Sequence, residues 1–172
     1  MTSVDAPRSA SPDARSANSS VAPGTMTGAD ALAEVLKREG VDKVFYFPAS
    51  PIAEAIARAG IRLILTRQER VAGNIADGVS RSTNGRQMGV VAVQELAGSE
   101  NAFPGIAHSY TDSTPILYLP GSPPRKKFGE HPTFMNQPHY DLVTKYAASP
   151  VTADEVPYRL RQAFQALRSG RP

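Results

Sequence analysis

Glu69 has the strongest chemical case in this sequence, because it stands between 61–65, an apolar segment that predicts a buried strand, and a run of small residues with helical character. Burial at such a position removes the hydration of a carboxylate and so favours its neutral form. A neutral carboxyl group can donate a hydrogen bond to a ligand nitrogen, which an ionised one cannot. The alternative is structural: a glutamate at the start of a helix is stabilised by the helix dipole.

The histidines and glycines are weaker candidates. His108 falls inside a predicted helix, which indicates a packing or surface role. His131 and His139 flank Phe134 in a long loop rich in Pro and Gly. No spacing of His, Asp and Glu is typical of a metal site, so we expect no metal ligands in this chain. The glycines do not form a phosphate-binding fingerprint, since none opens a helix directly after a strand.

Alternating strands and helices must position these residues. Hydrophobic periodicity, turn residues and capping residues predict both kinds of element. Strands are expected at 44–47, 61–65, 88–93 and 116–119, with a short one at 143–147; helices are expected at 27–39, 52–59, 69–81, 99–111 and from a cap at Asp154 onward. Strands separated by helices predict an α/β fold with a doubly wound, mostly parallel sheet and helices on both faces.

The carboxyl ends of parallel strands share one edge of the sheet, where ligands bind in such folds. Four segments should meet there: Pro48–Pro51, Arg67–Glu69, Gln94–Gly98 and the loop from Gly121. Their convergence favours a functional role for Glu69.

Composition narrows the class of protein. The 172 residues include no cysteine, which excludes disulfides and thiolate chemistry and fits the cytoplasmic location that we expect. A net charge of +3 does not indicate nucleic acid binding. No apolar run reaches the roughly 18 residues of a membrane helix. Residues 1–25, rich in Ser, Ala, Pro and Asp, predict a disordered tail, which leaves 26–172 as one domain.

A series of short motifs runs through residues 26–172. It comprises Met26–Leu32, Gly40–Phe45, Pro48, Arg67–Glu69, Ala76–Gly78, Asn101, Gly105–Ala107, Tyr110, Asp112–Ser113, Pro115, Val143–Lys145 and Ser169–Pro172. In this order, the series resembles the pyrimidine-binding, N-terminal domain of thiamine diphosphate (ThDP) enzymes of the acetolactate synthase-like and 2-oxo acid decarboxylase group. The joint order is more specific than any single motif.

The resemblance implies ThDP as cofactor and a small 2-oxo acid as substrate, which is decarboxylated or joined to a second molecule. Glu69 matches the glutamate that hydrogen-bonds N1′ of the aminopyrimidine and activates the cofactor. Pro48 and Asn101 match cofactor-binding segments, and Glu95 is placed near the cofactor edge. Related decarboxylases place histidines in a comparable loop, which makes His131 a second catalytic candidate.

Two segments depart from the family pattern. The family often has Ser-Gly-Pro-Gly where this chain has Glu95–Gly98, so Glu95 is either a new acid/base group or a surface replacement in a degraded site. Pro48-Ala49-Ser50 stands where the family has Pro-Gly-Gly. These departures put acetolactate synthase specificity in doubt, although not the cofactor class.

The resemblance also implies that Mg²⁺ and the cofactor diphosphate are held by a second domain, whose Gly-Asp-Gly signature is absent here. We therefore expect a partner: a diphosphate-binding domain or subunit in a homo- or hetero-oligomer. The chain is either the small subunit of a split enzyme or a fragment without its last strand, and it should expose an apolar sheet edge. Two other hypotheses are a non-catalytic interaction or regulatory domain of this fold, and an unrelated nucleotide or flavin domain.

Overall fold

A parallel four-stranded sheet with the strand order β2-β1-β3-β4 forms the centre of the protein. The computed structural model describes residues 25–48 and 52–171. The expected tail at 1–25, apart from Thr25, lies outside the described residues, as do positions 49–51 of the expected Pro48–Pro51 loop. The strands are β1 (Lys43–Tyr46), β2 (Arg62–Leu65), β3 (Gly89–Val93) and β4 (Ile116–Pro120).

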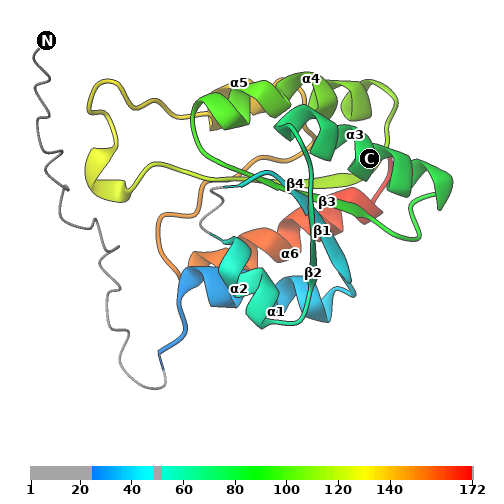
Figure 1. Ribbon diagram of the computed structural model, residues 1–172, viewed down its shortest axis with the longest axis horizontal. Coiled ribbons are helices and arrows are strands. Elements are labelled where there is room, and N and C mark those ends of the chain that lie inside the picture. The colour runs from blue at the N-terminus through cyan, green and yellow to red at the C-terminus, as the bar shows by residue number, and fades with distance from the viewer. Residues whose placement is uncertain (1–24, 49–51, 172) are drawn as a thin grey trace, which may run out of the picture.

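Helices cover both faces of this sheet, which confirms the predicted doubly wound α/β class (Figure 1). They are α1 (Gly28–Arg38), α2 (Ala53–Arg58), α3 (Glu69–Ser82), α4 (Ala97–Thr111), α5 (Gln137–Tyr140) and α6 (Glu155–Arg168), with one 3-10 turn, η1 (Arg125–Lys127). Within the described ranges, no helix is both long enough and apolar enough to cross a membrane.

Two apolar cores fill the space between the layers. The larger core joins α1, α2 and α6 to the sheet and centres on side chains such as Leu36, Ile56 and Phe164. The smaller core lies on the opposite face, where Ala72 and Ala76 of α3 meet β1, β3 and α4. Small residues on α3 let the helix lie close to the sheet, and this helix carries Glu69.

The predicted element boundaries hold within a few residues, but one expected strand and one expected helix cap are not observed. Residues 143–147 form no strand and are irregular, and Val143 and Thr144 both hydrogen-bond back to the carbonyl of Tyr140. Asp154 precedes α6 with a helical backbone, and its side chain makes no capping hydrogen bond. The Thr27 cap is confirmed: its hydroxyl accepts from the Asp30 amide at 3.1 Å in a capping box.

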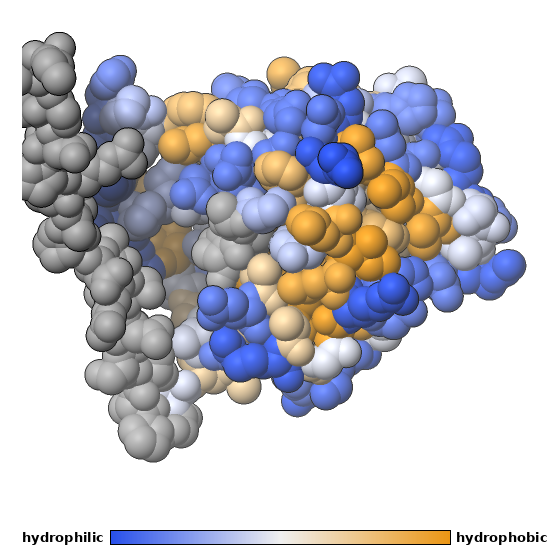
Figure 2. Space-filling model, in the orientation of Figure 1, coloured by the Kyte–Doolittle hydropathy of each residue, from blue (hydrophilic) through white to orange (hydrophobic). Residues whose placement is uncertain are grey.

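The strand expected to be buried at 61–65 lies instead at an edge of the sheet. Arg62 is exposed, and Leu65 is 59% exposed. Figure 2 shows apolar side chains gathered over β2 and the adjoining part of α3, where Ile75 is also exposed. The other edge strand, β4, borders an apolar cavity of about 390 Å³ between α4 and α6. The structure therefore has an exposed apolar edge, at the strand that leads into Glu69.

Helix α3 crosses β3 at Gly89 with no room for a side chain. A Cβ atom placed at Gly89 would lie 2.2 Å from the Ala76 carbonyl oxygen. The Ser80 hydroxyl strengthens this contact, because it accepts from the Gly89 amide at 2.7 Å and donates to the Pro115 carbonyl at 2.6 Å. One buried serine thus joins α3 to the segments that open β3 and β4.

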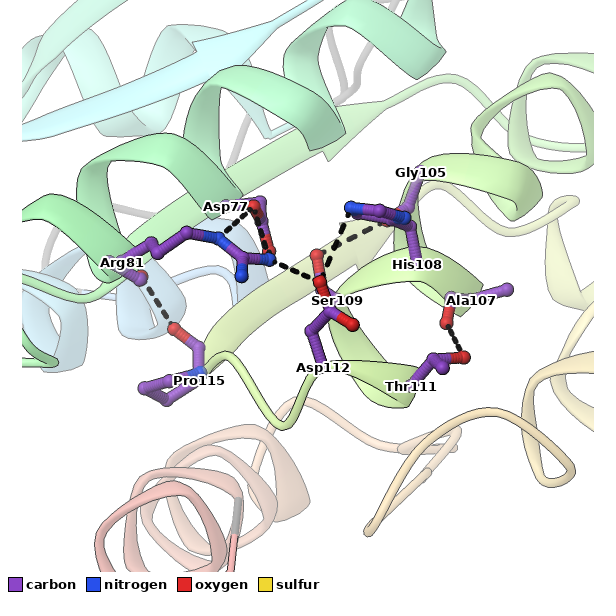
Figure 3. Close-up of polar contacts among 10 residues, drawn as sticks. Asp77, Arg81, Gly105, Ala107, His108, Ser109, Thr111, Asp112 and Pro115 are labelled. Carbon is purple, nitrogen blue, oxygen red and sulfur yellow. Dashed lines mark hydrogen bonds and ion pairs between the residues drawn. The ribbon is translucent and has the colours of Figure 1, made fainter.

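An ion-pair network ties the far ends of α3 and α4 together (Figure 3). The Arg81 guanidinium donates to Asp77, which is buried, and to Asp112 at 2.8 Å. Hydrogen bonds to these two carboxylates raise the pKa of Arg81. His108 is exposed, as a surface role predicts, and its Nε2 lies 3.6 Å from Asp112. The network holds α3 and α4 together at the end of each helix remote from Glu69.

Candidate functional site

Glu69 is the first residue of α3 and lies just beyond the carboxyl end of β2, as the sequence predicts. The chain turns sharply between the two elements, and the Thr66 hydroxyl donates to the Tyr46 and Gln68 carbonyls to hold this turn. Glu69 is only 4% exposed, although Arg67 and Gln68 beside it are exposed. The local fold thus points one carboxyl group inward at the edge where ligands of such sheets bind.

Two side-chain amides hold the Glu69 carboxyl group, one on each oxygen. Asn101 of α4 donates from Nδ2 to Oε2 at 2.6 Å, a short and strong contact. Gln94, directly after β3, donates from Nε2 to Oε1 at 3.3 Å, which is longer than a typical hydrogen bond. The structure therefore brings together Glu69 and Asn101, which the sequence had placed in different motifs.

Gln94 was not among the predicted site residues. It stands in the segment Gln94–Gly98 that was expected at this edge, and its place immediately after a buried strand was the available signal. Its side chain folds over Gly98, where an added Cβ atom would lie 2.0 Å from Gln94 Cγ. Gly98 therefore provides the space in which Gln94 reaches Glu69.

The turn between β3 and α4 is strained at Leu96. This residue has φ 54° and ψ −120°, a backbone conformation that glycine adopts readily and side-chain-bearing residues avoid. Residues held in such regions cost about 1–3 kcal/mol and persist where the surrounding structure fixes them. Here the Asn136 amide donates to the Leu96 carbonyl at 3.4 Å. The strain lies two residues from Gln94, in the turn that aims its side chain.

Leu96→Gly should unfold at a higher denaturant concentration than Leu96→Ala. Both changes remove the same contacts of the leucine side chain, but only glycine relieves the backbone, so we expect a difference of about 1–2 kcal/mol in the free energy of unfolding. At an unstrained position alanine would be the more stable of the two. Chemical denaturation of both variants checks the order, and a more stable alanine variant would show that Leu96 is not strained.

A buried tyrosine network supports the start of α4. The Tyr140 hydroxyl donates to the Ser99 carbonyl at 2.5 Å, and its oxygen lies 3.1 Å from the Tyr118 hydroxyl. Burial raises the pKa of Tyr118 and of Tyr140, so both stay neutral hydrogen-bond donors around neutral pH. The network anchors α5 to α4 and β4, two residues from Asn101.

A second contact between α4 and α5 lies next to this network. One oxygen of Glu100 accepts from Asn136 Nδ2 at 2.7 Å and lies 2.8 Å from His139 Nδ1. His139 also stacks on Phe134. The long loop after β4 is therefore tied at its end to the residue that precedes Asn101.

The remaining predicted site residues lie around this centre without contacting Glu69. Pro48 is exposed, two residues beyond β1. Glu95 is half-buried against Gly121, where its Oε2 would lie 3.0 Å from an added Cβ. His131 is exposed in the loop after β4, and across the described residues no hydrogen bond links it to Glu69. Roles for Pro48, Glu95 and His131 stay predictions.

Residues 26–143 match the family model for the thiamine pyrophosphate enzyme, N-terminal TPP binding domain. The chain belongs to this family. Its relatives include a probable acetolactate synthase large subunit of Methanocaldococcus jannaschii, 33% identical over 153 residues, which cover 86% of this chain and 25% of the relative. Acetolactate synthase 2, chloroplastic, of Nicotiana tabacum is 34% identical over 152 residues, which cover 84% of this chain and 22% of that relative. The acetolactate synthase large subunit of Haemophilus influenzae is 31% identical over 154 residues, which cover 86% of this chain and 26% of that relative.

These matches confirm the resemblance to the pyrimidine-binding domain of ThDP enzymes. The chain spans about a quarter of the length of the relatives it matches. The Glu69 site fits the pyrimidine half of the cofactor, because one oxygen of this buried carboxyl group is held only by the 3.3 Å contact from Gln94 and could bond a ring nitrogen in its place. In the part of the chain that the structure describes, no group of three His, Asp or Glu could hold a metal ion.

Proposed function

We propose that this chain is the pyrimidine-binding half of a ThDP-dependent enzyme that acts on small 2-oxo acids, by decarboxylation or carboligation. The main support is the position of the Glu69 carboxyl group, which is 4% exposed at the carboxyl end of β2 and is held by Gln94 and Asn101. Bound ThDP supplies an electron sink for cleaving or forming the bond next to the 2-oxo group. Membership of the family supports this cofactor.

Glu69 has two tasks in this proposal. Its carboxyl group bonds the aminopyrimidine ring at a nitrogen, which orients the ring and holds a proton between the two groups. Burial keeps water away from this bond and strengthens it. Asn101 fixes the side chain by its short bond to Oε2, so that Oε1 is the oxygen left to face the ligand.

A separate diphosphate-binding domain holds Mg²⁺ and the cofactor diphosphate, and the active site lies at the interface with it. A magnesium–diphosphate group needs several oxygen ligands and a cationic or amide-rich surface. Relatives of which the matched segment covers only about a quarter support the existence of such a domain. The exposed apolar edge at β2, with Leu65 four residues from Glu69, offers a surface beside the site for it.

Calorimetric titration of ThDP with Mg²⁺ tests this function, with the chain alone and mixed with a separately produced diphosphate-binding domain. We expect binding only in the mixture, and Glu69→Ala should weaken it about 10–100-fold, because a charge-assisted hydrogen bond in a buried site is lost. Absence of binding in the mixture would refute the proposal. It would favour a non-catalytic interaction domain that keeps the fold.

A further inference from the structure

We infer that Gln94 covers the oxygen of Glu69 that the cofactor must reach, and that it sets the affinity of this chain for the aminopyrimidine. The inference rests on the proposed function and adds a residue to it. Glu69 is only 4% exposed, so a ligand reaches its carboxyl group only where a neighbouring side chain moves away. The side chains that hydrogen-bond the two oxygens therefore decide which oxygen a ligand meets.

The two covering amides differ in strength. Asn101 bonds Oε2 at 2.6 Å, whereas Gln94 bonds Oε1 at 3.3 Å. A ring nitrogen approaching the carboxyl group displaces the weaker of two contacts more easily, and a 3.3 Å contact lies at the long end of hydrogen bonding. Oε1 is therefore the oxygen that becomes free, and Gln94 is the side chain that must turn away.

The packing around Gln94 shows what holds it over Oε1. Gly98, in the first turn of α4, leaves open the volume that the Gln94 side chain occupies: an added Cβ would lie 2.0 Å from Cγ and 2.8 Å from Nε2. A side chain at position 98 would therefore push the whole of Gln94 off Glu69. Two different substitutions, Gln94→Ala and Gly98→Ala, uncover the same oxygen by unrelated means.

Uncovering Oε1 removes a bond that the cofactor otherwise has to break. A hydrogen bond of this length changes an equilibrium modestly, so the expected gain in affinity is about 2–10-fold. The gain should appear in the dissociation constant of ThDP and be independent of turnover. Gln87, an exposed glutamine beyond α3, provides a control for the change from glutamine to alanine.

The experiment is calorimetric titration of ThDP with Mg²⁺ into the full chain mixed with the diphosphate-binding domain, using wild type, Gln94→Ala, Gly98→Ala, Gln87→Ala and Glu69→Ala. Circular dichroism checks that each variant folds; if Gly98→Ala does not fold, Gln94→Ala alone decides. Tighter binding by Gln94→Ala and by folded Gly98→Ala, with Gln87→Ala unchanged, supports the inference. Unchanged or weaker binding by either folded variant overturns it, while weakening by Glu69→Ala leaves the proposed function intact. Binding by none of the proteins overturns both.

Discussion

Gly89→Ala should lower the free energy of unfolding by about 3 kcal/mol, the largest loss of stability that we expect from one added methyl group in this chain. The new Cβ would lie 2.2 Å from the Ala76 carbonyl oxygen and 2.6 Å from its Cα, both backbone atoms of α3. Neither can give way without lifting the helix from β3. The lift would also stretch the 2.7 Å bond from the Gly89 amide to the Ser80 hydroxyl.

Gly78→Ala is the matched control for this prediction. It adds the same methyl group to α3, but no atom lies within 4 Å of the new Cβ. Because alanine is the better helix former, this variant should be more stable than wild type by up to about 1 kcal/mol. Urea denaturation of the two variants measures both effects. Equal stability of Gly89→Ala and wild type would mean that α3 does not approach β3 this closely.

Glu69→Gln should reduce the turnover of a 2-oxo acid by about 10²–10⁴-fold in the assembled enzyme, with little loss of fold. Glutamine keeps the size of the side chain and can still accept from Asn101 through its carbonyl oxygen. It cannot share an acidic proton with a ring nitrogen, which is the task that the proposed function gives to Glu69. Steady-state decarboxylation, measured with saturating ThDP and Mg²⁺, reports the loss.

Glu54→Gln makes the same chemical change at an exposed position on α2, and it should leave turnover unchanged. Its carboxylate is almost fully exposed and, among the residues that the structure describes, takes part only in a long ion pair with Arg58. Thermal melting of both variants shows whether either has lost its fold. Full turnover by folded Glu69→Gln would remove Glu69 from the chemistry and contradict the proposed function.

The sequence predicts the alternation of strands and helices because each element has its own local hydrophobic periodicity and turn residues. It does not predict which strand lies at the edge, because strand order depends on pairing between distant segments. The apolar segment 61–65 therefore suggested a buried strand, whereas β2 pairs only with β1 and exposes Leu65. The expected strand at 143–147 is also absent, and its residues line the cavity beside β4 as irregular chain.

The candidate site was predictable in part. Glu69 follows from the contrast between one acid and its apolar surroundings, and Asn101 from its place in the family pattern. Their hydrogen bond was not predictable, because it joins residues 32 positions apart through the packing of α3 on α4. Gln94 has no local signal beyond its position after β3. Its contact with Glu69 depends on Gly98 and on the strained backbone at Leu96, and neither feature is visible in composition or spacing.

The burial of β3 has a consequence for hydrogen exchange. All five residues of this strand are buried, and neighbours pair with it on both sides, whereas β2 is open along one edge. Backbone amides of β3 should therefore exchange only through near-global opening, and those of β2 through small local fluctuations. Glu69 thus follows an edge strand whose amides should exchange readily, and Gln94 follows an interior strand whose amides should exchange slowly. The hydrogen bond between Gln94 and Glu69 would thus join residues that follow two strands with very different rates of amide exchange.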